Sequence, residues 1–182
     1  MPELLTRQEQ TELLKIARDT IVSYVTSGHV PVIECSLHGL HQHAGCFVTI
    51  KQKGALRGCI GNFMSDQPLC QLVQELAVSA ATRDSRFYPM KTADLDDFKI
   101  DISVLSPLVK AASVEQIQVG IHGIYIIRGN YRGVLLPQVA TEYGWNREQF
   151  LRQTCIKAGL PENVWQGECD IYIFSALVFG EE

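Results

Sequence analysis

Six consecutive residues combine a thiol, a guanidinium and two glycines at a spacing that could support chemistry. They are Leu56-Arg57-Gly58-Cys59-Ile60-Gly61. In a strand, alternation places Arg57 and Cys59 on one face and Leu56 and Ile60 on the other. The two residues then stand about 6.5 Å apart, from a rise of about 3.3 Å per residue. A guanidinium at that separation favours the nucleophilic thiolate.

Gly58 and Gly61 carry no side chains beside this thiol. They let a ligand or a second backbone come close, or they permit a turn with positive φ. We therefore consider Gly58 and Gly61 as substrate-binding residues and Cys59 as a nucleophile activated by Arg57. The alternative is that Cys59 is a small, buried residue without reactivity, as free cysteines often are.

Asp84 and Arg86 lie in a loop that follows a predicted helix. They could form a local ion pair that shapes the loop, and an exposed pair of that kind stabilises little. Alternatively, they face a cleft, where Arg86 would bind a carboxylate or phosphate in bidentate fashion. Both interpretations stay open.

His122 lies between glycines in a segment predicted as a strand over residues 119–127. Gly120 shares its face of that strand and would leave space beside the imidazole. His122 is therefore the candidate general base or thiolate partner. The alternative is a hydrogen-bonded histidine with a structural role.

His38, His41 and His43, with Cys35 and Cys46, resemble a set of zinc ligands by residue type. Their spacing matches no structural-zinc pattern, so we interpret the segment as a solvated loop and predict no metal site. The chain has 6 cysteines and no C-x-x-C pair. We expect free thiols in a reducing compartment.

Hydrophobic periodicity and capping signals predict helices interspersed with strand hairpins, which favours a mixed α+β fold. Predicted helices begin after the capping residues Thr6 and Asn146, and two others have Pro68 and Pro137 as their first residues. Predicted strands cover residues 46–50, 56–61, 99–105, 119–127, 133–136 and 169–178. No linker divides residues 1–182, so we expect one domain, or two lobes around a shared core.

Composition excludes several classes of protein. The 182 residues include 16 Lys and Arg against 20 Asp and Glu, a formal charge of −4, and the basic residues form no run. A nucleic-acid partner is therefore not expected, because phosphate binding needs clustered cations. The N-terminus has no signal-peptide pattern, and no segment is apolar over the roughly 20 residues that span a bilayer. We expect a cytoplasmic protein without a membrane partner.

The motif at residues 56–61 resembles the hallmark of the AMME chromosomal-region protein family, whose bacterial members are called AmmeMemoRadiSam system protein A. Matching stretches follow in order from about residue 10 to about residue 178, among them residues 84–87, 102–107, 122–124, 135–140 and 157–160. The resemblance implies an antiparallel sheet flanked by helices, and two lobes with a cleft lined by the hallmark motif. It also implies partnership with a Memo-like protein and a radical S-adenosylmethionine enzyme. Their iron–sulfur cysteines and metal-binding histidines do not appear here, so we expect no cofactor in this chain.

Two hypotheses follow. In the first, the protein is a catalytic or redox accessory protein in which Cys59 reacts, Arg57 activates it, His122 accepts a proton, and Asp84 and Arg86 fix the substrate. In the second, it is a non-catalytic binding module or adaptor whose cleft holds a small molecule, a peptide, a nucleotide fragment or a partner protein. The sequence does not decide whether the protein is an enzyme.

Overall fold

The computed structural model describes residues 4–182 and has an α+β fold with two four-stranded antiparallel sheets and four α-helices. Contacts divide it into two compact units. The second unit is Ser106–Ala176, and the first combines the chain up to Leu105 with Leu177–Glu182. The predicted fold class is confirmed.

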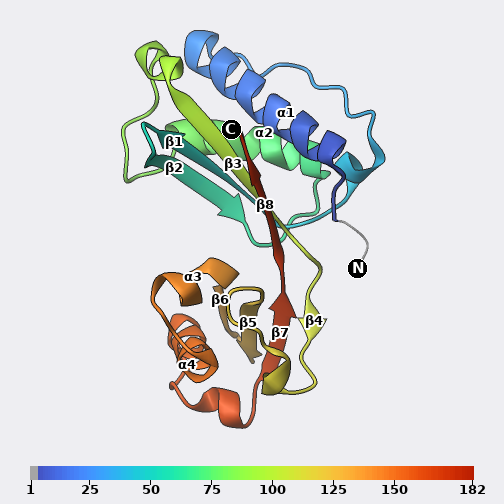
Figure 1. Ribbon diagram of the computed structural model, residues 1–182, viewed down its shortest axis with the longest axis vertical. Coiled ribbons are helices and arrows are strands. Elements are labelled where there is room, and N and C mark those ends of the chain that lie inside the picture. The colour runs from blue at the N-terminus through green and yellow to red at the C-terminus, as the bar shows by residue number, and fades with distance from the viewer. Residues whose placement is uncertain (1–3) are drawn as a thin grey trace. The chain divides into compact units, whose positions relative to one another are not determined.

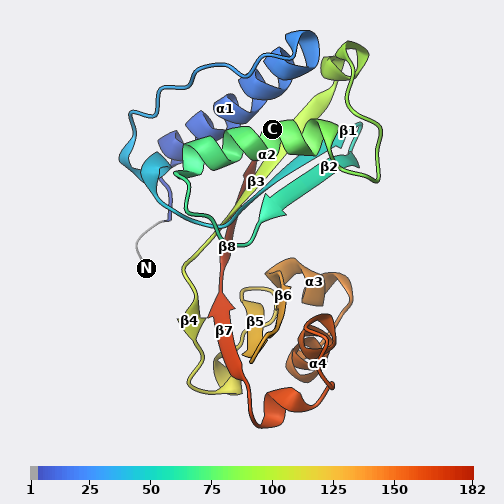
Figure 2. The same ribbon diagram turned by 180° about the vertical axis from the view of Figure 1, so that it is seen from behind.

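The sheet of the first unit has the strand order β2-β1-β3-β8 and is covered by two helices on one face (Figures 1 and 2). Its strands are β1 (Cys46–Gln52), β2 (Ala55–Asn62), β3 (Phe98–Leu105) and β8 (Ala176–Gly180). The helices are α1 (Arg7–Ser27) and α2 (Leu69–Thr82). Strand β2 therefore forms one edge of this sheet.

Local signals set the position of α1 as predicted. Thr6 and Glu9 form a capping box, in which each side chain accepts a backbone N–H of the other residue. The apolar residues Leu13, Ala17 and Ile21 are fully buried. They pack with alternate residues of β1 and β3, and this packing forms the core of the first unit.

The second unit has the strand order β4-β7-β5-β6. Its strands are β4 (Val109–Lys110), β5 (Gly123–Arg128), β6 (Tyr131–Leu135) and β7 (Asp170–Phe174), and its helices are α3 (Pro137–Glu142) and α4 (Arg147–Lys157). Asn146 caps α4 as predicted, and the structure shows that it does so in a capping box with Gln149. Ile124 and Ile126 of β5 pack against Phe150 and Leu151 of α4.

Three predictions about local structure are wrong. The strand predicted over residues 169–178 is interrupted at Ser175 and contributes β7 to one sheet and β8 to the other. The strand predicted from residue 119 begins only at Gly123, because Gly120 has a φ of +86° and belongs to a turn. Pro68 caps α2 instead of occupying its first turn.

The expectation that all cysteines are free thiols is also wrong. Cys35 and Cys70 form a disulfide across 35 positions of the chain. Cys46, Cys59, Cys155 and Cys169 are free. The sequence held no local signal for this pair, because its two residues come from different segments.

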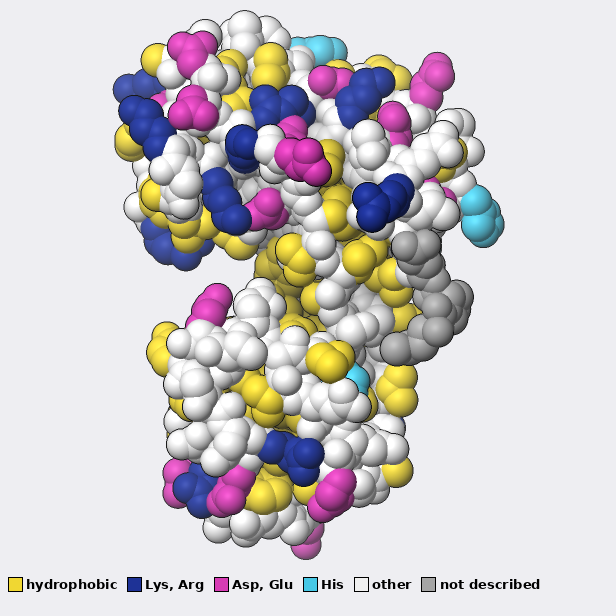
Figure 3. Space-filling model, viewed as in Figure 1, with side chains coloured by type: hydrophobic (Ala, Val, Ile, Leu, Met, Phe, Trp, Pro, Cys, Tyr) yellow, Lys and Arg dark blue, Asp and Glu magenta, His cyan; other side chains and the backbone are white. Residues whose placement is uncertain are grey.

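Within residues 4–182, no helix is both long enough and apolar enough to cross a membrane. On the face drawn in Figure 3, acidic and basic side chains of the described residues alternate over both units.

Candidate functional site

Residues 56–61 lie in the exposed edge strand β2, and a β-bulge changes which of them share a face. Thr49 of β1 lies opposite Cys59, and Lys51 lies opposite Leu56. Arg57 has no partner in β1, so it is the extra residue of the bulge. Leu56 and Cys59 therefore share a face, and the prediction that Arg57 and Cys59 share one is wrong.

Arg57 is buried, with 7% of its surface exposed. Its Nη2 donates to the carbonyl oxygen of Tyr88 at 2.9 Å and lies 3.6 Å from Oδ2 of Asp94. Its guanidinium carbon lies 4.4 Å from the centre of the Tyr88 ring, a cation–π distance. Arg57 therefore ties β2 to the segment that contains Tyr88 and Asp94.

Cys59 is half-buried, and its two polar ends have different partners. The Thr49 hydroxyl donates to Sγ of Cys59 at 3.1 Å. The backbone N–H of Cys59 donates to Oδ2 of Asp84 at 2.9 Å. Side chains of two different segments thus contact Cys59, one at its sulfur and one at its backbone.

Asp84 and Arg86 form the local ion pair that was one of the two predicted alternatives. Nε and Nη2 of Arg86 donate to the two carboxylate oxygens at 2.9 and 2.7 Å. Only 6% of Asp84 is exposed, whereas Arg86 is largely exposed. The Arg86 guanidinium holds the pKa of Asp84 well below its usual range, and the N–H of Cys59 lowers it further.

The same pair also caps the free edge of β2. Asp84 accepts the N–H of Cys59, and Nη2 of Arg86 lies 3.4 Å from the carbonyl oxygen of Cys59. Two side chains thus satisfy the groups that a neighbouring strand would otherwise pair. They fix the backbone on which the thiol stands.

The two motif glycines permit close packing. A Cβ at Gly58 would lie 2.1 Å from the carbonyl oxygen of Ala80, so the backbone of α2 occupies the space beside Gly58. A Cβ at Gly61 would lie 2.1 Å from the ring of Phe47. A second backbone therefore lies close to Gly58, as one of the two predicted alternatives required. The substrate-binding role of both glycines stays a prediction.

His122 belongs to the second unit and lies directly before β5. Its Nδ1 accepts the backbone N–H of Gln118 at 3.1 Å. The prediction that it stands within a strand is wrong. The structure gathers Cys59, Arg57, Asp84 and Arg86 in the first unit and places His122 in the other.

Thr49, Tyr88 and Asp94 also belong to the site, and the sequence analysis did not identify them. Thr49 could have been found from the β1–β2 hairpin, because the residue opposite a candidate thiol is set by the register of the two strands. Tyr88 and Asp94 carried no such signal, since they meet Arg57 only through the bulge.

The histidine-rich segment is the one for which the sequence predicts a solvated loop and no metal site. His38 and His41 lie in a short 3-10 turn, and Nε2 of His41 lies 2.6 Å from the carbonyl oxygen of Cys35. Nowhere in the described chain do three His, Cys, Asp or Glu side chains gather in a way that could hold a metal ion.

Two antiparallel sheets with flanking helices, and an edge strand that carries the glycine-flanked thiol, define an α+β protein with a site on its first unit. The AMMECR1 family model matches residues 14–179, and the chain belongs to this family. A protein of Methanopyrus kandleri is 42% identical, with 100% of this chain and 93% of that protein covered. A protein of Methanothermobacter thermautotrophicus is 42% identical, over 98% of this chain and 97% of its own length.

The fold is also that of a solved structure. The crystal structure of the uncharacterized protein PH0010 from Pyrococcus horikoshii matches with a TM-score of 0.85 and 34% identity. The match covers 99% of this chain and 95% of the other.

Proposed function

We propose that the protein is a cytoplasmic accessory protein whose Cys59 thiol acts as a nucleophile or redox group. One observation carries the proposal: Thr49 donates a hydrogen bond to Sγ of Cys59 at 3.1 Å, and the thiol is only half-buried. A buried structural cysteine needs neither the hydrogen bond nor the exposure.

In this proposal Arg86 is the cation close to Cys59, which is the role that the residue spacing predicted for Arg57. Nη2 of Arg86 lies 3.4 Å from the carbonyl oxygen of Cys59, and the hydrogen bonds that Arg86 donates to Asp84 are the chief cause of its raised pKa. Arg57 is a positioning residue, because its Nη2 binds the carbonyl oxygen of Tyr88. The role of His122 as proton acceptor stays a prediction, since His122 belongs to the second unit and Cys59 to the first.

The proposed partners are a Memo-like protein and a radical S-adenosylmethionine enzyme, by family resemblance. In this arrangement the partners supply the metal and radical chemistry, and this chain supplies a thiol on a rigid strand. The thiol would receive an electrophilic group or exchange with a disulfide.

A second candidate function is a binding module without catalysis. The observation that favours it is the ion pair of Asp84 and Arg86, in which Arg86 leaves 56% of its side chain exposed. An exposed guanidinium on a fixed loop can bind a carboxylate or phosphate. In this function Cys59 is selected for its small size.

Alkylation tests the proposed reactivity. The thiolate displaces iodide from iodoacetamide, and peptide mapping gives a separate rate for each cysteine as a function of pH. Cys169 is the internal control, because it is also partly exposed and burial raises the pKa of its thiol. We expect Cys59 to react about ten-fold faster than Cys169 at neutral pH, because burial raises the pKa of the Cys169 thiol and so lowers its thiolate fraction.

The Thr49→Val variant removes only the hydroxyl that donates to Cys59. We expect it to slow alkylation of Cys59 and to leave Cys169 unchanged. The proposal fails if Cys59 reacts as slowly as Cys169 and titrates like an ordinary thiol, near about 8.5.

The Cys59→Ala variant separates the two functions. If the protein is a binding module, we expect the variant to retain its affinity for a purified Memo-like protein and to support the same cellular function as the natural chain. If the protein is a catalytic or redox accessory protein, we expect the variant to form the complex and to lose the cellular function.

A further inference from the structure

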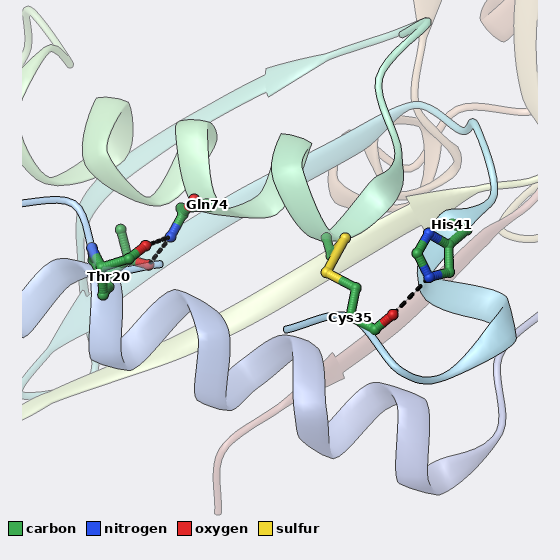
Figure 4. Close-up of a disulfide and its surroundings, with 6 residues drawn as sticks. Thr20, Cys35, His41 and Gln74 are labelled. Carbon is green, nitrogen blue, oxygen red and sulfur yellow. Dashed lines mark hydrogen bonds between the residues drawn. A yellow bond between two sulfur atoms is a disulfide. The ribbon is translucent and has the colours of Figure 1, made fainter. Parts of the chain in front are cut away.

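A segment without helix or strand, residues 29–36, crosses from α1 toward α2, and we call it the strap. Cys35 of the strap is joined to Cys70 of α2 by the disulfide shown in Figure 4. Nε2 of Gln74 donates to the carbonyl oxygen of Pro31 at 2.8 Å, and His41 contacts the carbonyl oxygen of Cys35 (Figure 4). The disulfide is the one covalent tie among these contacts.

The two sulfur atoms of this disulfide have different environments. Cys70 is 1% exposed and is the second residue of the 14-residue helix α2. Cys35 is half-buried in the strap, where the neighbouring Glu34 and Ser36 are exposed. Cys35 is thus the more exposed residue of the two, and we take its sulfur as the one that an incoming thiolate reaches.

The helix start also makes Cys70 the better leaving group. The partial positive charge of a helix N-terminus stabilises an anion in its first turn. Thiol–disulfide exchange is faster when the departing thiolate is stabilised. Position in the helix and exposure in the strap thus indicate the same direction of exchange.

We propose that Cys35–Cys70 is an exchangeable disulfide, whose substrate is a protein or small-molecule dithiol and whose attacked atom is Sγ of Cys35. One thiolate of the dithiol bonds to this sulfur, and the Cys35–Cys70 bond breaks with its electron pair on Cys70. The second thiolate of the dithiol then attacks the dithiol's first sulfur, which is bonded to Cys35 in the mixed disulfide. The bond to Cys35 breaks, and Cys35 leaves as a thiolate. The dithiol is oxidised to a disulfide, and Cys35 and Cys70 each take a proton.

Exchange changes the surface around the strap. Residues of the strap and of α1, among them Lys15, Asp19 and Glu34, line a cavity of about 330 Å³. After reduction only noncovalent contacts would hold the strap to α2 and His41, and we expect residues 29–36 to become more mobile. The two redox states therefore present this cavity differently, and the site is separate from Cys59.

The experiment uses the full chain with Cys59→Ser, so that its result does not depend on the proposed reactivity of Cys59. The oxidised protein is incubated with dithiothreitol in native buffer, sampled over time, alkylated and mapped by mass spectrometry. The buried free thiols of Cys46 and Cys155 are internal controls, because they become alkylatable only when their units unfold. We expect Cys35 and Cys70 to be labelled at least about ten-fold faster than these controls, as local opening requires.

A second arm tests the direction of attack. Incubation of the same protein with reduced glutathione, followed by an acid quench, traps the mixed disulfide. We expect the adduct on Cys35, and an adduct on Cys70 overturns the assigned direction.

A third arm measures the strap. Hydrogen exchange of residues 29–36 is expected to rise about ten-fold on reduction while β1 and β3 keep their protection. The proposal is overturned if Cys35 and Cys70 become labelled only together with the buried Cys46 and Cys155, because the disulfide then opens only by unfolding. If hydrogen exchange of the strap is unchanged in the fully reduced protein, the inference that reduction releases the strap is overturned.

Discussion

Replacing Asp84 by alanine tests whether side chains cap the edge of β2. The carboxylate accepts the N–H of Cys59 at 2.9 Å and three N–H groups of Arg86 at 3.2, 2.9 and 2.7 Å. The substitution removes all four hydrogen bonds. It leaves the N–H of Cys59 unpaired within the half-buried edge.

The expected loss of stability follows from how exposed each partner is. Arg86 is exposed over 56% of its side chain, so its pair with Asp84 contributes at most about 1 kcal/mol after solvent screening. A hydrogen bond from a backbone N–H to a charged, buried acceptor contributes about 1.5–3 kcal/mol. We therefore expect Asp84→Ala to lower the free energy of unfolding by about 3 kcal/mol.

The effect depends on pH, and its sign follows from the pKa of Asp84. This pKa is lowered in the folded protein, chiefly by Arg86. A lowered carboxyl pKa contributes stability that is present above the unfolded pKa, about 4, and is lost as the pH falls toward the folded pKa. The difference between the natural chain and Asp84→Ala should therefore be full at neutral pH and shrink below about pH 4.

Urea unfolding followed by circular dichroism measures this difference, and hydrogen exchange of the Cys59 amide shows where it arises. Asp96→Asn is the matched control, since Asp96 is an exposed carboxylate in the 3-10 turn Thr92–Asp96. A difference below about 0.5 kcal/mol at neutral pH, the range of ordinary surface substitutions, refutes the capping argument. A difference that is the same at every pH refutes the assigned role of the charge.

Two further substitutions test the surroundings of the thiol. Gly58→Ala places a Cβ 2.1 Å from the carbonyl oxygen of Ala80. Because neither backbone can move easily, we expect thermal unfolding to show that the free energy of unfolding falls by about 1–3 kcal/mol. Arg57→Met removes the buried cation that pairs with Asp94, and we expect urea unfolding to show a fall of about 3 kcal/mol in the free energy of unfolding while the alkylation rate of Cys59 is unchanged.

Both substitutions have outcomes that would contradict the structure. An unchanged midpoint for Gly58→Ala means that α2 does not approach β2 at this residue. A large fall in the alkylation rate of Arg57→Met means that Arg57 activates the thiol after all. Arg57→Lys is the matched control for charge, because it keeps the cation and loses the planar group that lies over Tyr88.

The sequence predicts those parts of the fold that depend on near neighbours in the chain. The capping boxes at Thr6 and Asn146 and the buried stripe of α1 all follow from residues three or four positions apart. The hairpin of β1 and β2 follows from two apolar runs around Gly54. These signals suffice for the α+β class.

The errors come from single residues whose effect the local pattern does not show. A bulge adds one residue and shifts every side chain beyond it to the other face, and no residue type marks Arg57 as that residue. At Gly120 one positive φ converts the start of a predicted strand into a turn. The bond between Cys35 and Cys70 depends on the packing of the strap against α2, which only the folded chain defines.

The bulge changes which residues of the 56–61 segment lie beside the thiol and which take part in packing. Arg57 leaves the face of the thiol and binds the carbonyl oxygen of Tyr88, while Asp84 from the same neighbouring segment binds the N–H of Cys59. Strand β2 and this segment thus hold each other at two positions of the motif, and Gly58 admits the backbone of α2 between those positions. Arg57, Gly58 and the backbone of Cys59 all take part in this packing. Cys59 is half-buried and its sulfur accepts the Thr49 hydroxyl, which is why the proposed chemistry rests on the thiol while its neighbours stabilise the strand.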